Sequence, residues 1–307
     1  MFRRATYTSR QLPIVMAFLA LALSRAAPLA AQESGTVVAR DKRVQGRSYV
    51  FPDTGETIQY ALFVPSNYDA AKKWPLIVGL HGAGRPFDWV MGYDGIIDFA
   101  QRDGFIMVTP LGYHPLGGYG APSPQPSPQA SSQGQRAPET PVPAPSEGLQ
   151  QLRRQSQALP ATTRDRSEKD VMNVFEIVRK EFSVDPDRIY LWGHSMGGGG
   201  TYHLAAKYPQ IWAALAVAAP GPRATLEQLE RFKQIPILVL QGDADQTVPA
   251  AGTRDTVAKM KQLGMEYIYV EIKGGDHSLF VSKNRETLSK IFSFFNIVQK
   301  NARGASN

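Results

Sequence analysis

Residues 188–200 read RIYLWGHSMGGGG, an apolar and aromatic run that leads into glycines around a single serine. The run has the composition of a buried strand, and the residues after Ser195 are expected to form a helix. Gly-x-Ser-x-Gly between a strand and a helix is typical of a sharp turn that lifts a serine hydroxyl above a sheet. Gly193 and Gly197 occupy the two positions of that turn where a side chain would clash. We therefore predict that Ser195 is a nucleophile.

Strands and helices alternate on both sides of this stretch. Residues 47–65 indicate an antiparallel hairpin around an Asp-Thr-Gly turn. The clearest helical pattern covers residues 167–182, with Ser167 expected at its start. Apolar runs, which are typical of strands covered on both faces, lie at residues 75–82, 104–110, 188–193, 212–220, 235–242 and 267–275. The alternation predicts an α/β fold with a mostly parallel eight-stranded sheet and helices on both faces.

Two segments depart from the alternating pattern. Residues 1–31 combine a basic start with an apolar stretch and end in small residues, which is typical of a secretory signal peptide. An uncleaved membrane anchor is the alternative. Residues from about 117 to 164 are rich in Pro, Ser, Gln and Gly, which predicts a disordered insertion, with a lid over the active site as the alternative. We expect residues 32–307 to form one domain around this insertion.

Composition excludes several classes of function. The formal net charge is +7, but four arginines lie in the expected signal peptide, and the remaining charge of about +3 indicates no nucleic-acid partner. The chain has no cysteine, which excludes disulfides, a thiolate nucleophile and cysteine-bound zinc. Its five histidines show no metal-binding spacing. We expect no metal and no cofactor.

A serine nucleophile needs a base and an acid that orients the base. In this architecture the acid and then the histidine follow the serine along the chain. His277, in Gly-Gly-Asp-His after the last expected strand, fits the base, whereas His203 is expected to lie inside the helix that begins at Ser195. Of the two carboxylates in GDADQTVP, residues 242–249, we favour Asp245 as the acid and keep Asp243 as the alternative.

Catalysis also requires donors for the negative charge that develops on the substrate oxygen. The N–H of Met196, directly after the nucleophile, is the first expected donor. The second is expected from His-Gly-Ala-Gly at residues 81–84, where we favour Ala83 over Gly82.

Aromatic residues beside the His-Gly-Ala-Gly loop are candidates for substrate binding. Phe87, Trp89 and Tyr93 are expected to form an aromatic wall for an aryl or apolar acyl group, and His194 is expected to line the pocket. The alternative is that these rings only pack their loop against the domain.

These motifs together resemble the α/β-hydrolase superfamily. From about residue 46 to 298, outside the Pro-rich insertion, the chain is similar to secreted feruloyl esterases and polyhydroxybutyrate depolymerases. The most specific part is DPDRIYLWGHSMGGGGTYHLAAKYPQIWAALAVAAPG at residues 185–221, which also resembles prolyl oligopeptidase catalytic domains. The absence of cysteine departs from many secreted members of these families.

The resemblance implies a serine carboxylesterase that hydrolyses carboxylic esters, including aryl or feruloyl-type esters, through an acyl-enzyme. Its substrates would be small-molecule or polymer-linked esters, without a nucleic-acid partner or stable membrane association. The enzyme would be secreted or periplasmic, and the sequence does not indicate its oligomeric state. The alternatives are a serine peptidase of the prolyl oligopeptidase type and a catalytically silent binding protein on the same scaffold.

Overall fold

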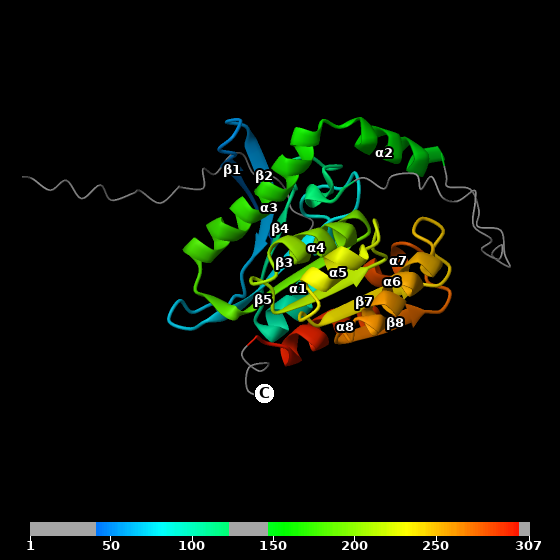
Figure 1. Ribbon diagram of the computed structural model, residues 1–307. Coiled ribbons are helices and arrows are strands. Elements are labelled where there is room, and N and C mark those ends of the chain that lie inside the picture. The colour runs from blue at the N-terminus through cyan, green and yellow to red at the C-terminus, as the bar shows by residue number, and fades with distance from the viewer. Residues whose placement is uncertain (1–40, 123–146, 301–307) are drawn as a thin grey trace, which may run out of the picture. The chain divides into compact units, whose positions relative to one another are not determined.

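Eight strands form one sheet at the centre of the molecule (Figure 1). The computed structural model describes residues 41–122 and 147–300, so the expected signal peptide lies outside the described residues. The strand order is β1-β2-β4-β3-β5-β6-β7-β8. The strands are β1 (Gln45–Val50), β2 (Thr57–Phe63), β3 (Trp74–Leu80), β4 (Ile106–Pro110), β5 (Val184–His194), β6 (Ala214–Ala218), β7 (Ile237–Gly242) and β8 (Tyr267–Ile272).

The direction and burial of the strands follow their sequence patterns. β2 runs antiparallel to β1 and to β4, and the remaining neighbours are parallel. All seven residues of β3 and all five of β6 are buried, as expected of continuous apolar runs covered on both faces. The predicted mostly parallel sheet is therefore confirmed, and the carboxyl ends of β3, β5, β6, β7 and β8 meet at one edge.

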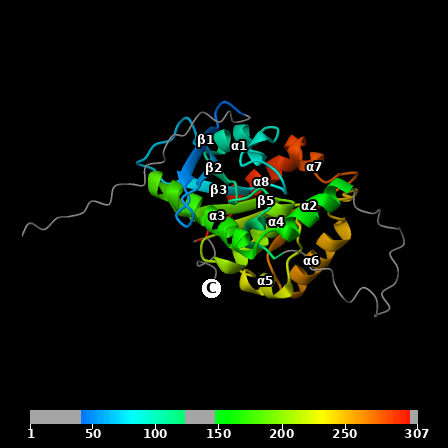
Figure 2. The same cartoon turned by 90° about the horizontal axis from the view of Figure 1, so that it is seen from above.

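Helices cover both faces of the sheet (Figure 2). α1 and α8 lie on one face, and α3, α4, α5 and α6 lie on the other. Each face has its own cluster of buried apolar side chains. The helices are α1 (Ile96–Asp103), α2 (Glu147–Ala158), α3 (Ala161–Glu181), α4 (Met196–Lys207), α5 (Leu226–Arg231), α6 (Ala250–Gln262), α7 (Leu279–Ser282) and α8 (Arg285–Ile297).

The prediction of a disordered insertion over residues 117–164 was wrong for its described parts. Residues 147–158 form α2, and α3 begins at Ala161 instead of Ser167. The dense run of prolines ends at Pro145, and residues 147–158 are mostly Gln, Arg, Leu and Ala, which favour helices. Ser167 is fully buried inside α3, where its Oγ accepts a hydrogen bond from the Tyr119 N–H. Residues 123–146 lie outside the described residues.

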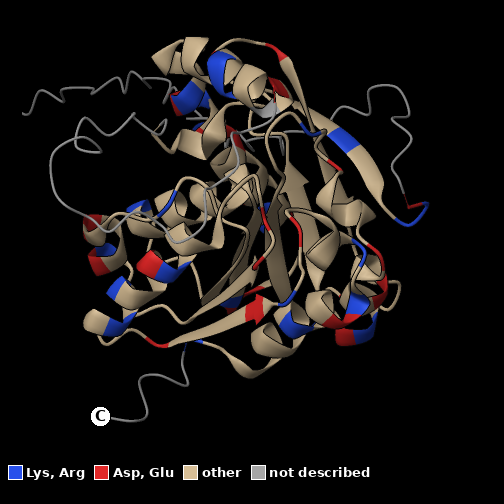
Figure 3. Cartoon of the chain, turned by 90° about the vertical axis from the view of Figure 1, so that its right-hand side faces the viewer, with Lys and Arg blue, Asp and Glu red and all other residues tan. Residues whose placement is uncertain are grey.

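Charged residues are distributed over the outer helices and loops, with basic and acidic positions interspersed along the ribbon (Figure 3). In residues 41–122 and 147–300, none of the helices combines the length and apolarity that a bilayer span requires.

Candidate active site

Ser195 lies between β5 and α4, at the edge of the sheet where the parallel strands end. Its backbone has φ 58° and ψ −118°, a conformation that residues with a side chain rarely adopt. The neighbouring backbone is packed too closely for further side chains. A Cβ on Gly193 would lie 2.1 Å from the Gly197 carbonyl oxygen, and one on Gly197 would lie 2.2 Å from that of Leu80. The glycines therefore permit the turn that exposes the Ser195 hydroxyl.

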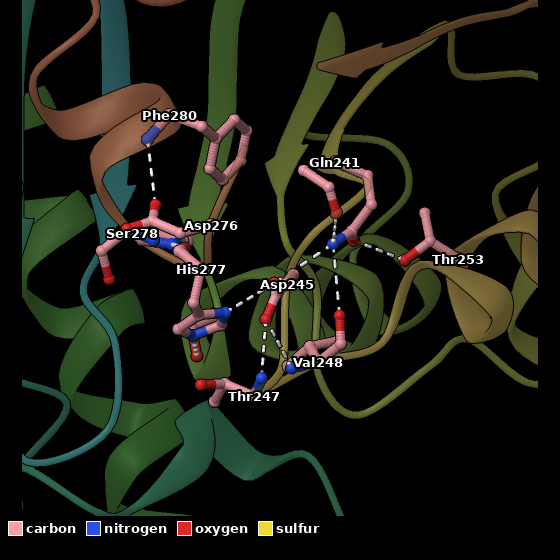
Figure 4. Close-up of polar contacts among 12 residues, drawn as sticks. Gln241, Asp245, Thr247, Val248, Thr253, Asp276, His277, Ser278 and Phe280 are labelled. Carbon is pink, nitrogen blue, oxygen red and sulfur yellow. Dashed lines mark hydrogen bonds and ion pairs between the residues drawn. The ribbon is translucent and has the colours of Figure 1, made fainter. Parts of the chain in front are cut away.

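Three side chains from three loops meet at this edge. His277 follows β8, and its Nε2 lies 2.8 Å from Ser195 Oγ. Asp245 follows β7, and its Oδ2 lies 2.7 Å from His277 Nδ1 (Figure 4). An ionised carboxylate only accepts, so Nδ1 carries the proton and Nε2 is free to accept the serine proton. The structure thus brings together the serine, base and acid that the sequence analysis selected.

The carboxylate of Asp245 is buried and held by several donors (Figure 4). Its Oδ1 accepts the N–H groups of Thr247 and Val248, both at 2.8 Å, and Oδ2 also accepts from Gln241 Nε2 at 3.1 Å. Burial alone would raise the pKa of Asp245, but the hydrogen bond and charge of His277 and the backbone donors lower it overall. Asp245 therefore remains a fixed negative charge beside the imidazole.

The other residues considered for the base and the acid have different partners. Asp243 Oδ1 accepts the Gly274 N–H at 2.6 Å, which fixes the neighbouring loop. His203 lies within α4 and pairs with Glu168, with 2.7 Å between Nε2 and Oε2. Neither contacts the Ser195 hydroxyl in the structure.

A second histidine supports His277 from behind. His194 Nε2 lies 2.7 Å from the backbone carbonyl oxygen of His277, which can only accept, so Nε2 carries the proton. Neutral His194 then accepts the hydroxyl proton of Tyr93 at Nδ1. The pKa of His194 is lowered to about 3. Burial is the largest cause, and repulsion from the charged form of His277 is the second. The pair is therefore a neutral, directional support for the backbone that carries the base.

The structure does not support the prediction of an aromatic wall for the substrate. Phe87 and Tyr93 are only 5% and 4% exposed, and His194 is fully buried. Trp89 is half-buried and stacks on His194, with ring centroids 5.3 Å apart. None of the four is among the residues that line the cavity at Ser195. The loop folds its rings inward because they complete the core on the α1 and α8 face.

The two expected oxyanion donors lie at the cavity with Ser195. Met196 is the first residue of α4, where an N–H has no acceptor within the helix. In the described part of the chain, the Ala83 N–H also has no hydrogen-bond acceptor. The N–H of Gly82, the alternative, likewise has no acceptor there, and a Cβ on Gly82 would lie 3.5 Å from the Ser195 Cβ. Both Ala83 and Gly82 therefore stay candidates for the second donor.

The cavity beside Ser195 has a volume of about 480 Å³. Its walls come from the segments after β3, β4, β6 and β7, from the first residues of α4 and α6, and from α2 and α3. Leu152 of α2 lies against the loop after β3, 3.3 Å from a hypothetical Cβ on Gly84. The segment first interpreted as a disordered insertion thus forms part of the cavity wall, which favours the alternative of a covering element.

The extra glycines after the nucleophile allow other segments to approach α4. A Cβ on Gly198 or Gly199 would lie 2.8 Å or 2.3 Å from Pro220 or Pro222, respectively. One on Gly200 would lie 2.6 Å from the Tyr119 ring. The glycines therefore bring the loop after β6 against the nucleophile helix, where it forms a wall of the cavity.

Sequence reasoning missed two supporting elements. Gln241 is a fully buried amide whose Nε2 donates to Asp245, and whose Oε1 accepts from Thr253 at 2.7 Å. A polar residue near the end of the apolar strand ILVLQG was the available signal. The Tyr93–His194 pair had no such signal, because it joins residues 101 positions apart. Within the described residues, no cluster of His, Cys, Asp and Glu could hold a metal ion.

Residues 152–299, slightly less than half of the chain, match a family model described as PET hydrolase-like. Cutinase 1 of Thermobifida cellulosilytica is 30% identical over 94 residues, which cover 31% of this chain and 34% of the cutinase. A cutinase of Thermobifida fusca is 30% identical over 94 residues, covering 31% of this chain and 30% of the relative. The chain thus spans about a third of the length of these curated relatives.

Solved structures resemble the chain over a larger part of its length. A thermostable esterase has a TM-score of 0.56 at 23% identity, covering 84% of this chain and 64% of that one. A ferulic acid esterase from Anaeromyces mucronatus, solved with ferulic acid, has a TM-score of 0.59 at 16% identity, covering 87% and 92%. These likenesses show the α/β-hydrolase fold, and the predicted resemblance to esterases of that fold is confirmed.

Proposed function

We propose that this protein is a serine hydrolase that cleaves carboxylic esters through an acyl-enzyme on Ser195. The observation that carries the proposal is the continuous hydrogen-bonded series from Ser195 Oγ through His277 to Asp245, with distances of 2.8 Å and 2.7 Å. The series opens onto a cavity of about 480 Å³, a size suited to a small ester or the end of a polymer.

The geometry supports acyl transfer in two steps. Ser195 Oγ attacks the ester carbonyl while His277 Nε2 takes the hydroxyl proton, and the carboxylate of Asp245 stabilises the imidazolium. In this proposal the N–H groups of Ala83 and Met196 stabilise the negative oxygen of the tetrahedral intermediate. His277 then protonates the leaving alcohol, and the same groups activate water to release the acid.

The activity is tested with p-nitrophenyl butyrate and a matched peptide p-nitroanilide. We expect ester hydrolysis that Ser195→Ala lowers by about 10⁴-fold or more, and little cleavage of the amide. Faster cleavage of the amide would support the peptidase alternative instead. Absence of turnover on a broad panel of esters, by protein with a native unfolding transition, would contradict the proposal.

We also propose that residues 1–31 are a signal peptide and that the mature protein is secreted or periplasmic. The basic start, apolar stretch and small residues before Gln32 support this interpretation. Amino-terminal sequencing of the exported protein should begin at Gln32. A protein that retains residues 1–31 in the membrane fraction would favour the anchor instead.

A further inference from the structure

The cavity beside Ser195 contains charges of only one sign. Every charged side chain in its wall is an arginine, and the three come from different segments: Arg153 from α2, Arg164 from α3 and Arg223 from the loop after β6. Elsewhere on the outer helices, basic and acidic residues lie interspersed (Figure 3). The positive charge is therefore concentrated where a substrate would enter.

Arg164 is fixed in the cavity wall. Its guanidinium donates to the carbonyl oxygens of Ser156 at 2.9 Å and Ala121 at 3.2 Å. Partial burial lowers the pKa of Arg164, although an arginine remains charged at neutral pH. The first bond connects α3 to α2, and the second connects α3 to the segment after β4, so both hold the arginine-bearing wall together.

Few acidic groups compete with a ligand for the guanidinium groups of Arg153 and Arg223. Arg153 is exposed and forms no ion pair with any residue in the described part of the chain. Arg223 pairs with Asp255 at 3.4 Å, and both side chains are mostly exposed, at 60% and 69%. Such exposed pairs contribute little and dissociate readily. Both guanidinium groups can therefore turn to a ligand.

The aliphatic stem of Arg223 occupies the space that a side chain at Gly252 would fill. Its Cδ lies 2.7 Å from the place where a Cβ on Gly252 would be, so the stem packs directly on the first turn of α6. Gly252 lines the same cavity. The guanidinium is thus presented from a stem that is supported at the cavity wall.

From this arrangement we infer that the cavity recognises an ester that also carries a carboxylate group. A guanidinium binds a carboxylate through paired charge-assisted hydrogen bonds, whereas a neutral ester offers it only weaker acceptors. The three arginines line the same cavity as Ser195, so the carboxylate would lie in the same cavity as the carbonyl that is attacked. The inference rests on the proposed ester hydrolysis at Ser195.

The test compares esters that differ in charge. Monomethyl adipate carries the carboxylate on the acyl half, and dimethyl adipate is its neutral counterpart. 6-Acetoxyhexanoate carries the carboxylate on the alcohol half, and hexyl acetate is its neutral counterpart. We expect the charged ester to have about a tenfold higher kcat/KM in at least one pair, the size expected for one charge-assisted interaction. The ratio should fall when NaCl is raised from 0.05 M to 0.5 M, because salt screens exposed charges.

Variants identify the groups responsible for the preference. Arg153→Gln and Arg223→Gln should each lower the charged-to-neutral ratio several-fold, and the double variant should lower it further. Arg179→Gln is the matched control, because Arg179 is exposed on α3 about 22 Å along the helix from Arg164. That control removes the same charge outside the cavity and should leave the ratio as it is.

The outcomes separate this inference from the proposed function. Hydrolysis of the neutral esters without a preference for either charged ester would overturn the inference and leave the proposed function intact. A preference that survives the double variant and high salt would also overturn it. If no ester in either pair is hydrolysed, the proposed function itself fails.

Discussion

The two sides of Ser195 are built on different physical principles. Behind the nucleophile, buried Tyr93 and buried, neutral His194 form directional hydrogen bonds that lead to the His277 backbone carbonyl and pack against aromatic rings. In front of it lies a cavity with small and apolar walls and exposed arginines. Behind Ser195, burial makes the loss of any hydrogen-bond partner costly in folding free energy, whereas the residues of the cavity can be replaced with small effects on the fold. The region behind Ser195 therefore supports the chemistry, and the cavity in front of it determines the choice of substrate.

The largest expected effect concerns the acid behind His277. Asp245→Asn should lower kcat by about 10⁴-fold, because an amide neither stabilises the imidazolium nor enforces its tautomer. Asp243→Asn is the matched control, since Asp243 only accepts the Gly274 N–H and an asparagine oxygen can do the same. Steady-state kinetics on p-nitrophenyl butyrate measures both variants. Equal losses, or a larger loss for Asp243→Asn, would reassign the acid.

Removing the Tyr93 hydroxyl tests whether the support that His194 gives to His277 depends on the hydrogen bond from Tyr93. Tyr93→Phe leaves the buried Nδ1 of His194 without its donor, so the free energy of unfolding should fall by about 1–3 kcal/mol. Urea unfolding measures this change, and we expect a several-fold lower kcat from the less constrained base.

Tyr202→Phe is the matched control for this variant. The Tyr202 hydroxyl is also buried, but it has no hydrogen-bond partner among residues 41–122 and 147–300, so its removal should be neutral or stabilising. Similar losses of stability in the two variants would show that hydroxyl removal alone, and not the bond to His194, is responsible.

The pH dependence of stability tests the neutral state of His194. Its pKa is lowered to about 3 in the folded protein, against about 6.5 in an unfolded chain. Between these values the unfolded chain binds a proton that the folded protein does not, so stability should fall as the pH falls from about 6.5 toward 3. This group alone contributes at most about 1.4 kcal/mol per pH unit.

His194→Gln isolates that contribution, because glutamine can still donate to the His277 carbonyl but does not titrate. Urea unfolding at pH 7.5, 6.5 and 5.5 should give a shallower pH slope for this variant than for the native protein. Identical slopes would contradict a buried neutral imidazole at position 194.

The smallest effect is expected on the cavity side. Leu152→Ala removes an apolar side chain of α2 from the cavity wall, so KM for p-nitrophenyl butyrate should rise about three- to tenfold with little change in kcat. Leu226→Ala, on the exposed side of α5 and outside the cavity wall, should leave both constants nearly unchanged. An unchanged KM for Leu152→Ala would show that α2 does not contact the substrate.

The convergence of Ser195, Asp245 and His277 was largely predictable from sequence, whereas the Tyr93–His194 pair was not. The strand-turn-helix context of Ser195, and the places of Asp245 and His277 after later strands, follow from local patterns and chain order. The parallel sheet then brings the three loops to one edge. Local motifs suffice here because topology alone determines which loop ends are neighbours.

The cavity side was not predictable in the same way. The rings of the loop at residues 85–93 suggested a substrate wall, yet most are buried, because burial depends on packing partners such as α1 and α8 that local sequence does not reveal. The Pro-rich composition before residue 146 concealed the helix that follows it, and with it the contribution of Leu152 and Arg153 to the cavity. Composition averaged over a long segment cannot locate such a boundary.

The central claim is that Ser195 is an activated nucleophile, and labelling with a fluorophosphonate probe tests it most directly. Peptide mapping of the folded protein should find one adduct, on Ser195, that is absent from Ser195→Ala and forms much more slowly in His277→Gln. Folded protein that remains unlabelled, or that is labelled on another serine, would contradict the account.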